Sequence, residues 1–341
     1  MIKTRRIEYH IWIIRNGAEF GEARCVSAPQ IRMSSDAEIK KTLNAKVILP
    51  DGVDMLHDML APRMLIDGVE YPLGEYYIGT CTEVTNDYGQ RAADIEAYDG
   101  GFLPSRYRTE NIYHIAAGDK YTDVIQALLI ESGITKLLVS DNPATFATAR
   151  EDWEIGTDYL TIINDLLAEI NYGSLWFDNN GYARIEPKRA VSVDDIHHIY
   201  TSGKYSVLAV AGERETDIFD KYNVFIAYVD NADNDELMIA KAVNDDPASI
   251  LSVQNRGRIQ APPKRLNNIA SQDELQAYVD NWRNQSMTSV ETLKISTEID
   301  RDHAVLDTVQ CEDNLYLETG WSLTLGEEYL LDHTLQREYY I

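Results

Sequence analysis

The feature that most constrains the fold of this chain is a series of short β-rich runs that end in turn residues. A run over 6–14 is rich in Ile, Tyr and Trp and leads to Asn16-Gly17, and a run over 64–66 leads to Asp67-Gly68. Asn-Gly and Asp-Gly favour two-residue hairpin turns because these residues tolerate positive φ. The pattern predicts an antiparallel barrel or sandwich over roughly the first hundred residues.

Further strands are expected in this N-terminal region. Pro50-Asp51-Gly52 and Pro72-Leu73-Gly74 interrupt the runs, and Asn86-Asp87-Tyr88-Gly89 supplies the last turn. The segments between these turns are rich in β-branched and aromatic residues, which pleated surfaces accommodate well. The additional strands are expected over 42–49, 69–71, 75–78, 81–85 and 92–98.

Two helices are expected in the middle of the chain. In the first, Asp119 or Thr122 is the N-cap and Gly133 ends the helix. In the second, Thr157 is the N-cap and Gly173 the C′ residue, and Asp158 suits the positive N-terminal end. The apolar residues at helical spacing are Val124, Ala127, Leu128 and Ile130, then Leu160, Ile163, Leu166, Leu167 and Ile170.

A hairpin follows the second helix. Leu175-Trp176-Phe177 leads into the turn Asp178-Asn179-Asn180-Gly181, and the segment 182–185 returns as its partner strand. The helices and this hairpin predict a compact α/β unit over about 112–195.

Strands return after residue 200. Ser271 and Glu274 form a capping box for a helix over 271–288 that carries Leu275 and Trp282 on its apolar face. The strands are expected over 205–210, 223–229, 307–311, 321–325 and 329–340, with Leu293, Ile295, Thr297 and Ile299 on one face of another. In the last strand, Leu331, His333 and Leu335 alternate with polar neighbours.

The order of these elements predicts an α+β fold that is mostly β, in three domains. The first β-barrel covers 1–111, the α/β domain with two helices and a hairpin covers 112–199, and a second barrel with one helix covers 200–341. About two or three domains also fit a length of 341 residues.

The charge balance excludes some functions. The chain has 56 acidic and 31 basic residues, a formal net charge of -25. Sequence-independent binding to nucleic acid phosphates and polybasic membrane anchoring both require an excess of Lys and Arg. Two interpretations stay open: a soluble, self-repelling surface, or an acidic surface to which passing nucleic acid does not adhere.

No signal peptide or membrane anchor is expected. The N-terminal run around Ile7–Ile14 is interrupted by Glu8 and His10, and no apolar run approaches the ~20 residues that span a bilayer. The three cysteines, Cys25, Cys81 and Cys311, are far apart and lack the spacing of a metal site. They are interpreted as small hydrophobic residues of a protein folded in a reducing cytoplasm.

No catalytic motif is found, and we expect no catalytic, cofactor-binding or metal-binding residue. Phosphate-binding loops, dinucleotide-binding glycine motifs and the hydrolase and metalloprotease motifs are absent from the sequence. His197-His198 is interpreted as part of a solvated interdomain linker and not as a metal site. The segment Asp230–Glu236 lacks the central Gly of a calcium loop and is interpreted as an acidic hairpin tip. Trp153, Trp176 and Trp282 are assigned to core packing and not to a sugar groove.

Three groups of residues, taken in order, indicate a family. The first is the stretch Ile66–Ile78 followed by 93–99; the second is Trp153–Thr157 with the helix and hairpin that lead to Pro187; the third is Tyr222-Asn223-Val224 with 244–249. In their order and spacing they resemble tail-hub proteins of tailed bacteriophages over nearly the whole chain.

This resemblance implies a non-enzymatic hub of a phage tail tip or baseplate. Such proteins have two tail-tube-type barrels joined by an α/β unit. A homotrimer then forms a pseudo-sixfold ring between the sixfold tube and the threefold tip, with DNA passing through the lumen without specific binding. The implied partners are the tail tube or distal tail protein, a spike, fibre or lysin protein, and the tape-measure protein. The implied location is the virion tail tip, after assembly in the host bacterial cytoplasm.

Two alternatives remain from the sequence. One is a tail-associated cell-wall-degrading enzyme, although the lysin domain of many relatives is expected to be absent or a separate protein. The other is a carbohydrate-binding module, which would use exposed Trp and Tyr side chains.

Overall fold

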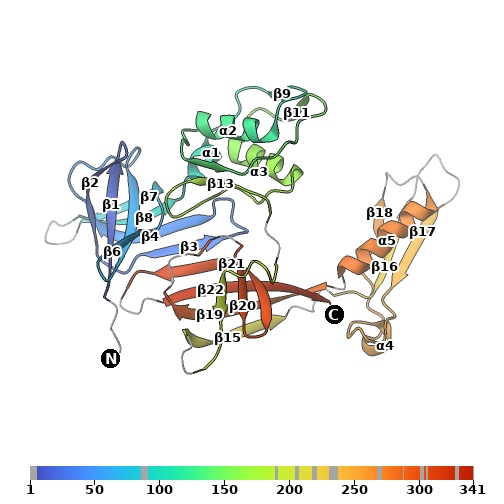
Figure 1. The fold of residues 1–341 in the computed structure, drawn as a ribbon. Helices are drawn as coiled ribbons and strands as arrows, with labels where there is room; N and C mark the ends of the chain where they lie inside the picture. Colours follow the sequence, from blue (N-terminus) through green and yellow to red (C-terminus); the bar gives the residue numbers. More distant parts are fainter. Residues whose placement is uncertain are drawn as a thin grey trace. The chain divides into compact units, whose positions relative to one another are not determined.

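The computed structural model shows strands and helices in the proportions expected of the predicted fold class (Figure 1). Strands account for 46% and helices for 16%, which confirms an α+β fold that is mostly β. The structure describes residues 6–85, 91–188, 191–203, 207–216, 221–229, 237–266, 271–286, 288–299, 303–304, 306–326 and 330–340.

Six antiparallel strands close into a barrel in the N-terminal region. β4 pairs with both β2 and β8, and the path β2–β1–β5–β7–β8 connects these two neighbours. The six strands are β1 (Ile7–Arg15), β2 (Ala18–Cys25), β4 (Lys41–Ile48), β5 (Met59–Ile66), β7 (Tyr76–Thr85) and β8 (Arg91–Tyr98). Their inward side chains, among them Ile11, Leu43 and Leu60, are fully buried. The first barrel is therefore confirmed.

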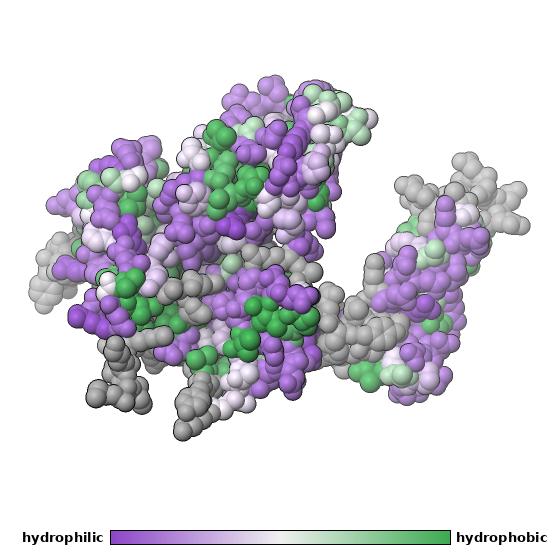
Figure 2. All heavy atoms as spheres, viewed as in Figure 1, coloured by the Kyte–Doolittle hydropathy of each residue, from purple (hydrophilic) through white to green (hydrophobic). Residues whose placement is uncertain are grey.

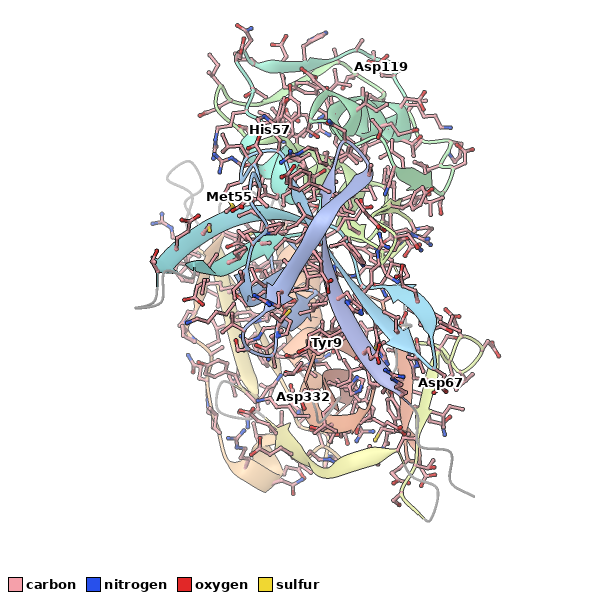
Figure 3. The ribbon with its side chains drawn as sticks, turned by 90° about the vertical axis from the view of Figure 1, so that its left-hand side faces the viewer. Tyr9, Met55, His57, Asp67, Asp119 and Asp332 are labelled. Atoms are coloured by element: carbon pink, nitrogen blue, oxygen red, sulfur yellow. The ribbon has the colours of Figure 1, made fainter. Side chains whose placement is uncertain are left out.

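Both hairpin turns predicted from the sequence are present. Asn16 and Gly17 have φ values of 51° and 76°, and Asp67 and Gly68 have φ values of 51° and 83°. The second turn connects β5 to β6 (Val69–Pro72). Asp67 lies beside the start of β1 (Figure 3), and its N–H donates to the carbonyl of Arg6 (2.8 Å).

The segments 75–78 and 81–85, predicted as two strands, form the single strand β7. Its register to β8 shifts between Ile78 and Thr80, as in a β-bulge. A Cβ on Gly79, at the bulge, would lie 2.5 Å from the ring of Tyr98, so only glycine fits there. β2 was not predicted because its side chains are mostly exposed and polar.

The barrel sheet continues into the C-terminal part of the chain. β21 pairs antiparallel with β3, from Gly320 opposite Ser34 to Thr324 opposite Gln30. Sheet order runs β15–β19–β22–β21–β3–β4, with β14 and β20 attached at β21. The bounds are β3 (Gln30–Ser34), β14 (His198–Tyr200), β15 (Leu208–Thr216), β19 (Thr288–Glu298), β20 (Thr308–Cys311), β21 (Asn314–Thr324) and β22 (Leu330–Tyr340).

The predicted faces of two of these strands are confirmed. Along and just after β19, Leu293, Ile295, Thr297 and Ile299 are all buried, and on β22 so are Leu331, His333 and Leu335. Side chains alternate between the two faces of a strand, and this alternation correctly predicted that the polar His333 lies in the interior with Leu331 and Leu335.

A small α/β region follows the barrel in the chain. β10 pairs in parallel with β13, which pairs antiparallel with β12, and β9 pairs antiparallel with β11. This region confirms the two helices and the hairpin. Its elements are α1 (Phe102–Arg106), β9 (Tyr113–Ile115), α2 (Tyr121–Glu131), β10 (Leu137–Val139), β11 (Arg150–Trp153), α3 (Tyr159–Glu169), β12 (Trp176–Phe177) and β13 (Ala183–Ile185).

The predicted caps of both helices need correction. Lys120, and neither Asp119 nor Thr122, is the N-cap of α2, and its side chain makes no capping hydrogen bond. The carboxylate of Asp119 accepts from the N–H of Ala116 (3.1 Å). In α3 the cap is Asp158, not Thr157: its carboxylate accepts from the N–H of Thr161 (2.8 Å). This helix ends before Asn171, whose φ is 59°, and not at Gly173.

The chain divides into two compact units, 1–211 with 295–335 and 212–294 with 336–341. In the second unit, β16 pairs antiparallel with β17 and in parallel with β18, and α5 packs on this sheet through Leu275 and Val279. The elements are β16 (Val224–Val229), β17 (Met238–Val243), α4 (Val253–Arg256), β18 (Lys264–Leu266) and α5 (Gln272–Ser286).

This unit corrects the prediction of one barrel over 200–341. The segment 223–229 is a strand of a separate sheet that is formed by β16, β17 and β18. The helix predicted over 271–288 corresponds to α5, which covers one face of this sheet and shares a core with it. The domain boundaries near 111 and 199 remain predictions.

Hydrophilic residues dominate the face seen in Figure 2, and apolar residues form scattered patches. Exposed large apolar residues include Leu56, Ile112, Ile155 and Val193. Within the described segments, no helix has the length and apolar character needed to span a membrane.

Candidate functional site: a buried histidine–carboxylate cluster

A buried cluster of ionisable side chains lies in the first unit, among residues of β14, β19, β21 and β22. Glu318 on β21 lies between two imidazoles: its carboxylate oxygens are 2.7 Å from His303 Nδ1 and 2.6 Å from His333 Nδ1. The exposed fractions of these three side chains are 0%, 2% and 0%. A carboxylate buried so deeply requires compensating hydrogen bonds or charge, and the two histidines provide them.

Two hydroxyl groups lie at the outer nitrogens of these histidines. Tyr200 OH is 3.2 Å from His303 Nε2, and Thr297 Oγ1 is 2.8 Å from His333 Nε2. The Thr297 hydroxyl also donates to the carbonyl of Glu298 (3.0 Å). Each imidazole is therefore held at both nitrogens, which fixes its orientation.

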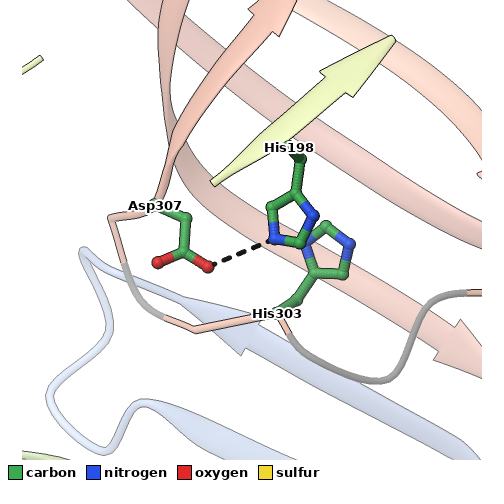
Figure 4. Close-up of side chains that lie close together, drawn as sticks. All are labelled: His198, His303 and Asp307. Atoms are coloured by element: carbon green, nitrogen blue, oxygen red, sulfur yellow. Dashed lines mark ion pairs between the residues drawn. The ribbon is translucent and has the colours of Figure 1, made fainter. Parts of the chain in front are cut away.

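A third histidine extends the cluster. The ring of His198, on β14, stacks on that of His303 with centroids 3.9 Å apart, and its Nε2 lies 3.5 Å from a carboxylate oxygen of Asp307 (Figure 4). Asp307 accepts from the N–H of Ala304 (2.9 Å) with that same oxygen. Within the described residues, these contacts define two sets of closely spaced ligand atoms, His198–His303–Asp307 and His303–Glu318–His333.

The environment shifts the proton affinities of the cluster. Burial by itself would raise the pKa of Glu318, but the hydrogen bonds from His303 and His333 outweigh burial and lower it. Burial lowers the pKa of His333, although the neighbouring carboxylate opposes this. The two histidine partners therefore stabilise the charged form of Glu318, whereas burial disfavours the charged form of His333.

The interpretation of His197-His198 as a solvated linker is wrong. His198 is a strand residue opposite Val309 of β20, and its side chain is 10% exposed. His197 Nδ1 accepts a hydrogen bond from the N–H of Thr308 (3.1 Å). His198 is thus built into the sheet through the parallel pairing of β14 with β20, whereas His197 is exposed just before β14.

The other residues singled out from the sequence lie elsewhere. Trp153 and Trp176 are buried in cores, and Trp282 packs edge-on against Phe225 with centroids 5.1 Å apart, which confirms core packing. The cysteines are free thiols; Cys311 is buried, and burial raises the pKa of Cys25 to about 11. The segment Asp230–Glu236 lies outside the described residues.

Sequence reasoning missed His303, Glu318 and His333 as a group. They come from a connection and two different strands, so no short motif contains them. One signal was present: His333 occupies an apolar position in the alternation of β22, between Leu331 and Leu335. A histidine at such a position needs a buried partner.

Comparison with known proteins identifies the class of fold. No protein-family model matches the sequence, and no curated protein matches it either. The fold is similar to that of the tail protein from Neisseria meningitidis MC58, with a TM-score of 0.61 and 12% identity, covering 96% of both chains. It is also similar to the 43 kDa tail protein of prophage MuSo2 from Shewanella oneidensis, with a TM-score of 0.62 and 10% identity, covering 96% of this chain and 98% of that chain.

A prophage tail protein from Listeria monocytogenes EGD-e is a third similar structure, with a TM-score of 0.53 and 10% identity, covering 96% of this chain and 94% of that chain. The chain thus has the fold of phage tail proteins over nearly its entire length. The resemblance seen in the sequence is confirmed at the level of the fold.

Proposed function

We propose that this chain is a structural hub of a phage or phage-derived tail tip or baseplate. The observation that carries the proposal is the similarity of fold to bacterial and prophage tail proteins along 96% of the chain. Each compared structure is itself matched over 96% or more of its length. Similarity at 10–12% identity concerns backbone architecture, so the proposed role rests on architecture and not on a catalytic site.

The proposed active form is a homotrimeric ring. Each chain contributes a closed antiparallel barrel and a second group of strands that continues its sheet through the β3–β21 pairing. Three chains would therefore supply six β units around one axis. This arrangement adapts a sixfold tail tube to a threefold tip, and closed oligomers of this kind use one repeated interface.

DNA passes through the lumen of this ring without being bound. A net charge of -25 gives the protein an excess of acidic side chains, which repel phosphates when they line the channel. The proposed partners are the tail tube or distal tail protein, the tape-measure protein and a spike, fibre or lysin protein. The ring is assembled in the host cytoplasm and is located at the virion tail tip.

We also propose that the chain is not an enzyme. Within the described residues, the side chain of Glu318 is fully buried in the His–Glu–His cluster, so a polymer substrate does not reach its carboxylate there.

Native mass spectrometry over a concentration series tests the proposal. The expected product is a species of three 38.7 kDa chains, about 116 kDa, that forms without intermediate ladders of open oligomers. Release of sugar from peptidoglycan would favour the cell-wall-degrading alternative. A monomer that binds glycans tightly would favour the carbohydrate-binding alternative.

A further inference from the structure

We propose that His303, Glu318 and His333 bind one divalent transition-metal cation, with Zn²⁺ the best match to the donor set. Two imidazole nitrogens and one carboxylate are a ligand set that proteins use for zinc, with a fourth position left for water. All three side chains converge on one point in the interior of the first unit, and their ligand atoms lie within 4.8 Å of one another. Their exposed fractions do not exceed 2%.

The hydrogen bonds at Thr297 indicate why a cation fits. Its hydroxyl has one proton, which goes to the carbonyl of Glu298, so the hydroxyl must accept from His333 Nε2–H. A neutral His333 then has a lone pair on Nδ1, which points at a carboxylate oxygen 2.6 Å away. Two lone pairs facing each other repel, unless a proton or a cation lies between them.

A cation at Nδ1 is compatible with the contacts that both histidines already make at Nε2. With a metal at Nδ1, both histidines stay neutral and each Nε2–H donates to a hydroxyl, Tyr200 for one and Thr297 for the other. Outer partners of this kind orient metal-binding histidines in known sites.

The cluster must open slightly to accept the ion. Ligand distances of about 2.0–2.1 Å around a tetrahedral centre place neighbouring ligand atoms about 3.3 Å apart. The present distances of 2.6 Å and 2.7 Å are those of hydrogen bonds, so binding would displace the proton between each pair and separate the groups by about 0.6–0.7 Å. The ion would then tie the connection at His303 to strands β21 and β22.

The second ligand set, His198–His303–Asp307, is less suitable. His303 cannot serve both sets through the same nitrogen, and the Asp307 oxygen nearest His198 already accepts from the N–H of Ala304. In the stacked arrangement the His198 ring faces that of His303 and not a shared central point. We therefore assign the ion to the Glu318 set.

The test uses the full-length protein, stripped with a chelator, equilibrated with excess Zn²⁺ and desalted. The expected result is close to one zinc per chain by elemental analysis, with two imidazole ligands in the X-ray absorption spectrum. Glu318→Gln and His333→Gln are expected to reduce the zinc content at least tenfold. His114→Gln is the matched control, because it removes an exposed histidine that faces Glu151 (3.0 Å), and it should retain the metal.

Asp307→Asn distinguishes the two ligand sets and should also retain the metal. Less than a tenth of an equivalent in the folded wild-type protein would overturn the proposal. So would retention of zinc by folded Glu318→Gln, or a loss confined to Asp307→Asn. If the buried variants do not fold, the Co²⁺ spectrum of the wild type decides: absorption typical of a four-coordinate site with nitrogen and oxygen ligands supports the assignment, and the spectrum of the hydrated ion contradicts it.

Discussion

The backbone N–H of Lys41 donates a hydrogen bond to the carboxylate of Asp99 (2.9 Å), and both side chains are buried in the first unit. Lys41 Nζ donates to Asn179 Oδ1 (2.8 Å), at the turn between β12 and β13. Burial lowers the pKa of Lys41 to about 8 and raises that of Asp99 to about 6. A charged residue thus connects the barrel to the α/β region at an energetic cost.

This cost predicts an unusual alkaline pH dependence. Because the pKa of Lys41 is about 8 when folded and 10.5 ordinarily, the folded state binds fewer protons than the unfolded state between these values. The free energy of unfolding should therefore rise as the pH increases from 8 to 10, by on the order of 2 kcal/mol. Urea unfolding at several pH values measures this rise.

Lys41→Met should remove the rise, whereas Lys46→Met should keep it, because Lys46 is exposed and pairs with Asp94 at 3.6 Å. Equal slopes in the wild type and Lys41→Met would show that Lys41 is not responsible.

At the turn Asp67-Gly68, replacing the glycine is expected to lower stability only through the backbone conformation that the turn requires. Gly68 has φ of 83°, and a Cβ there would meet no atom within 4 Å. Gly68→Ala should therefore lower the free energy of unfolding by about 1 kcal/mol through backbone strain and not through a clash. Gly173→Ala is the control, since its φ is not positive and the nearest atom is 4.0 Å away, and it should change stability little. Thermal unfolding compares the two variants; a larger loss for Gly173→Ala would contradict the explanation.

The contact between Gly100 and Phe177 predicts coupling across two regions. A Cβ on Gly100 would lie 2.3 Å from the Phe177 ring, so Gly100→Ala should destabilise the protein by about 1–3 kcal/mol through overpacking. Phe177→Leu provides space at the same point. The double variant should be less destabilised than the sum of the two single variants by about 1 kcal/mol. Strict additivity in a double-mutant cycle would mean that the two residues do not share this contact.

The N-cap of α3 predicts a graded series. Asp158→Ala removes the acceptor for the Thr161 N–H and should cost about 1 kcal/mol, whereas Asp158→Asn keeps an acceptor and should cost only a few tenths. Denaturant unfolding followed by circular dichroism measures both. Equal losses for Ala and Asn would indicate that the charge, and not the cap, stabilises the helix.

The sequence predicted most of what depends on local chemistry. Asn16-Gly17 and Asp67-Gly68 form the expected turns because positive φ is a property of the dipeptide itself. Helix α2 was placed correctly, but its buried face only in part: the predicted Leu128 is buried, whereas the predicted Ile130 is 57% exposed. Thr122, Ile125 and Leu129 are also buried and were not predicted. Because the buried face includes the polar Thr122, the spacing of apolar residues alone does not reveal it. Tertiary packing decides which face of the helix is buried.

Contacts between segments that are distant in the chain were not predicted from the sequence. The β3–β21 pairing connects residues almost 300 positions apart, and β3 has only Ile31 and Met33 as apolar inward residues. The His–Glu–His cluster has the same origin, since β21 and β22 bring Glu318 and His333 together with a histidine from the preceding connection. Spacing along the chain carries no signal for such contacts. The separate sheet around α5 was missed because β16 reads as an ordinary barrel strand.

Electron cryo-microscopy of the purified, concentrated protein tests the central claim most directly. The account predicts closed rings of three chains with threefold symmetry, six β units around the axis and a central lumen lined by acidic side chains. Single chains at every concentration, or rings whose channel wall is neutral or basic, would contradict it.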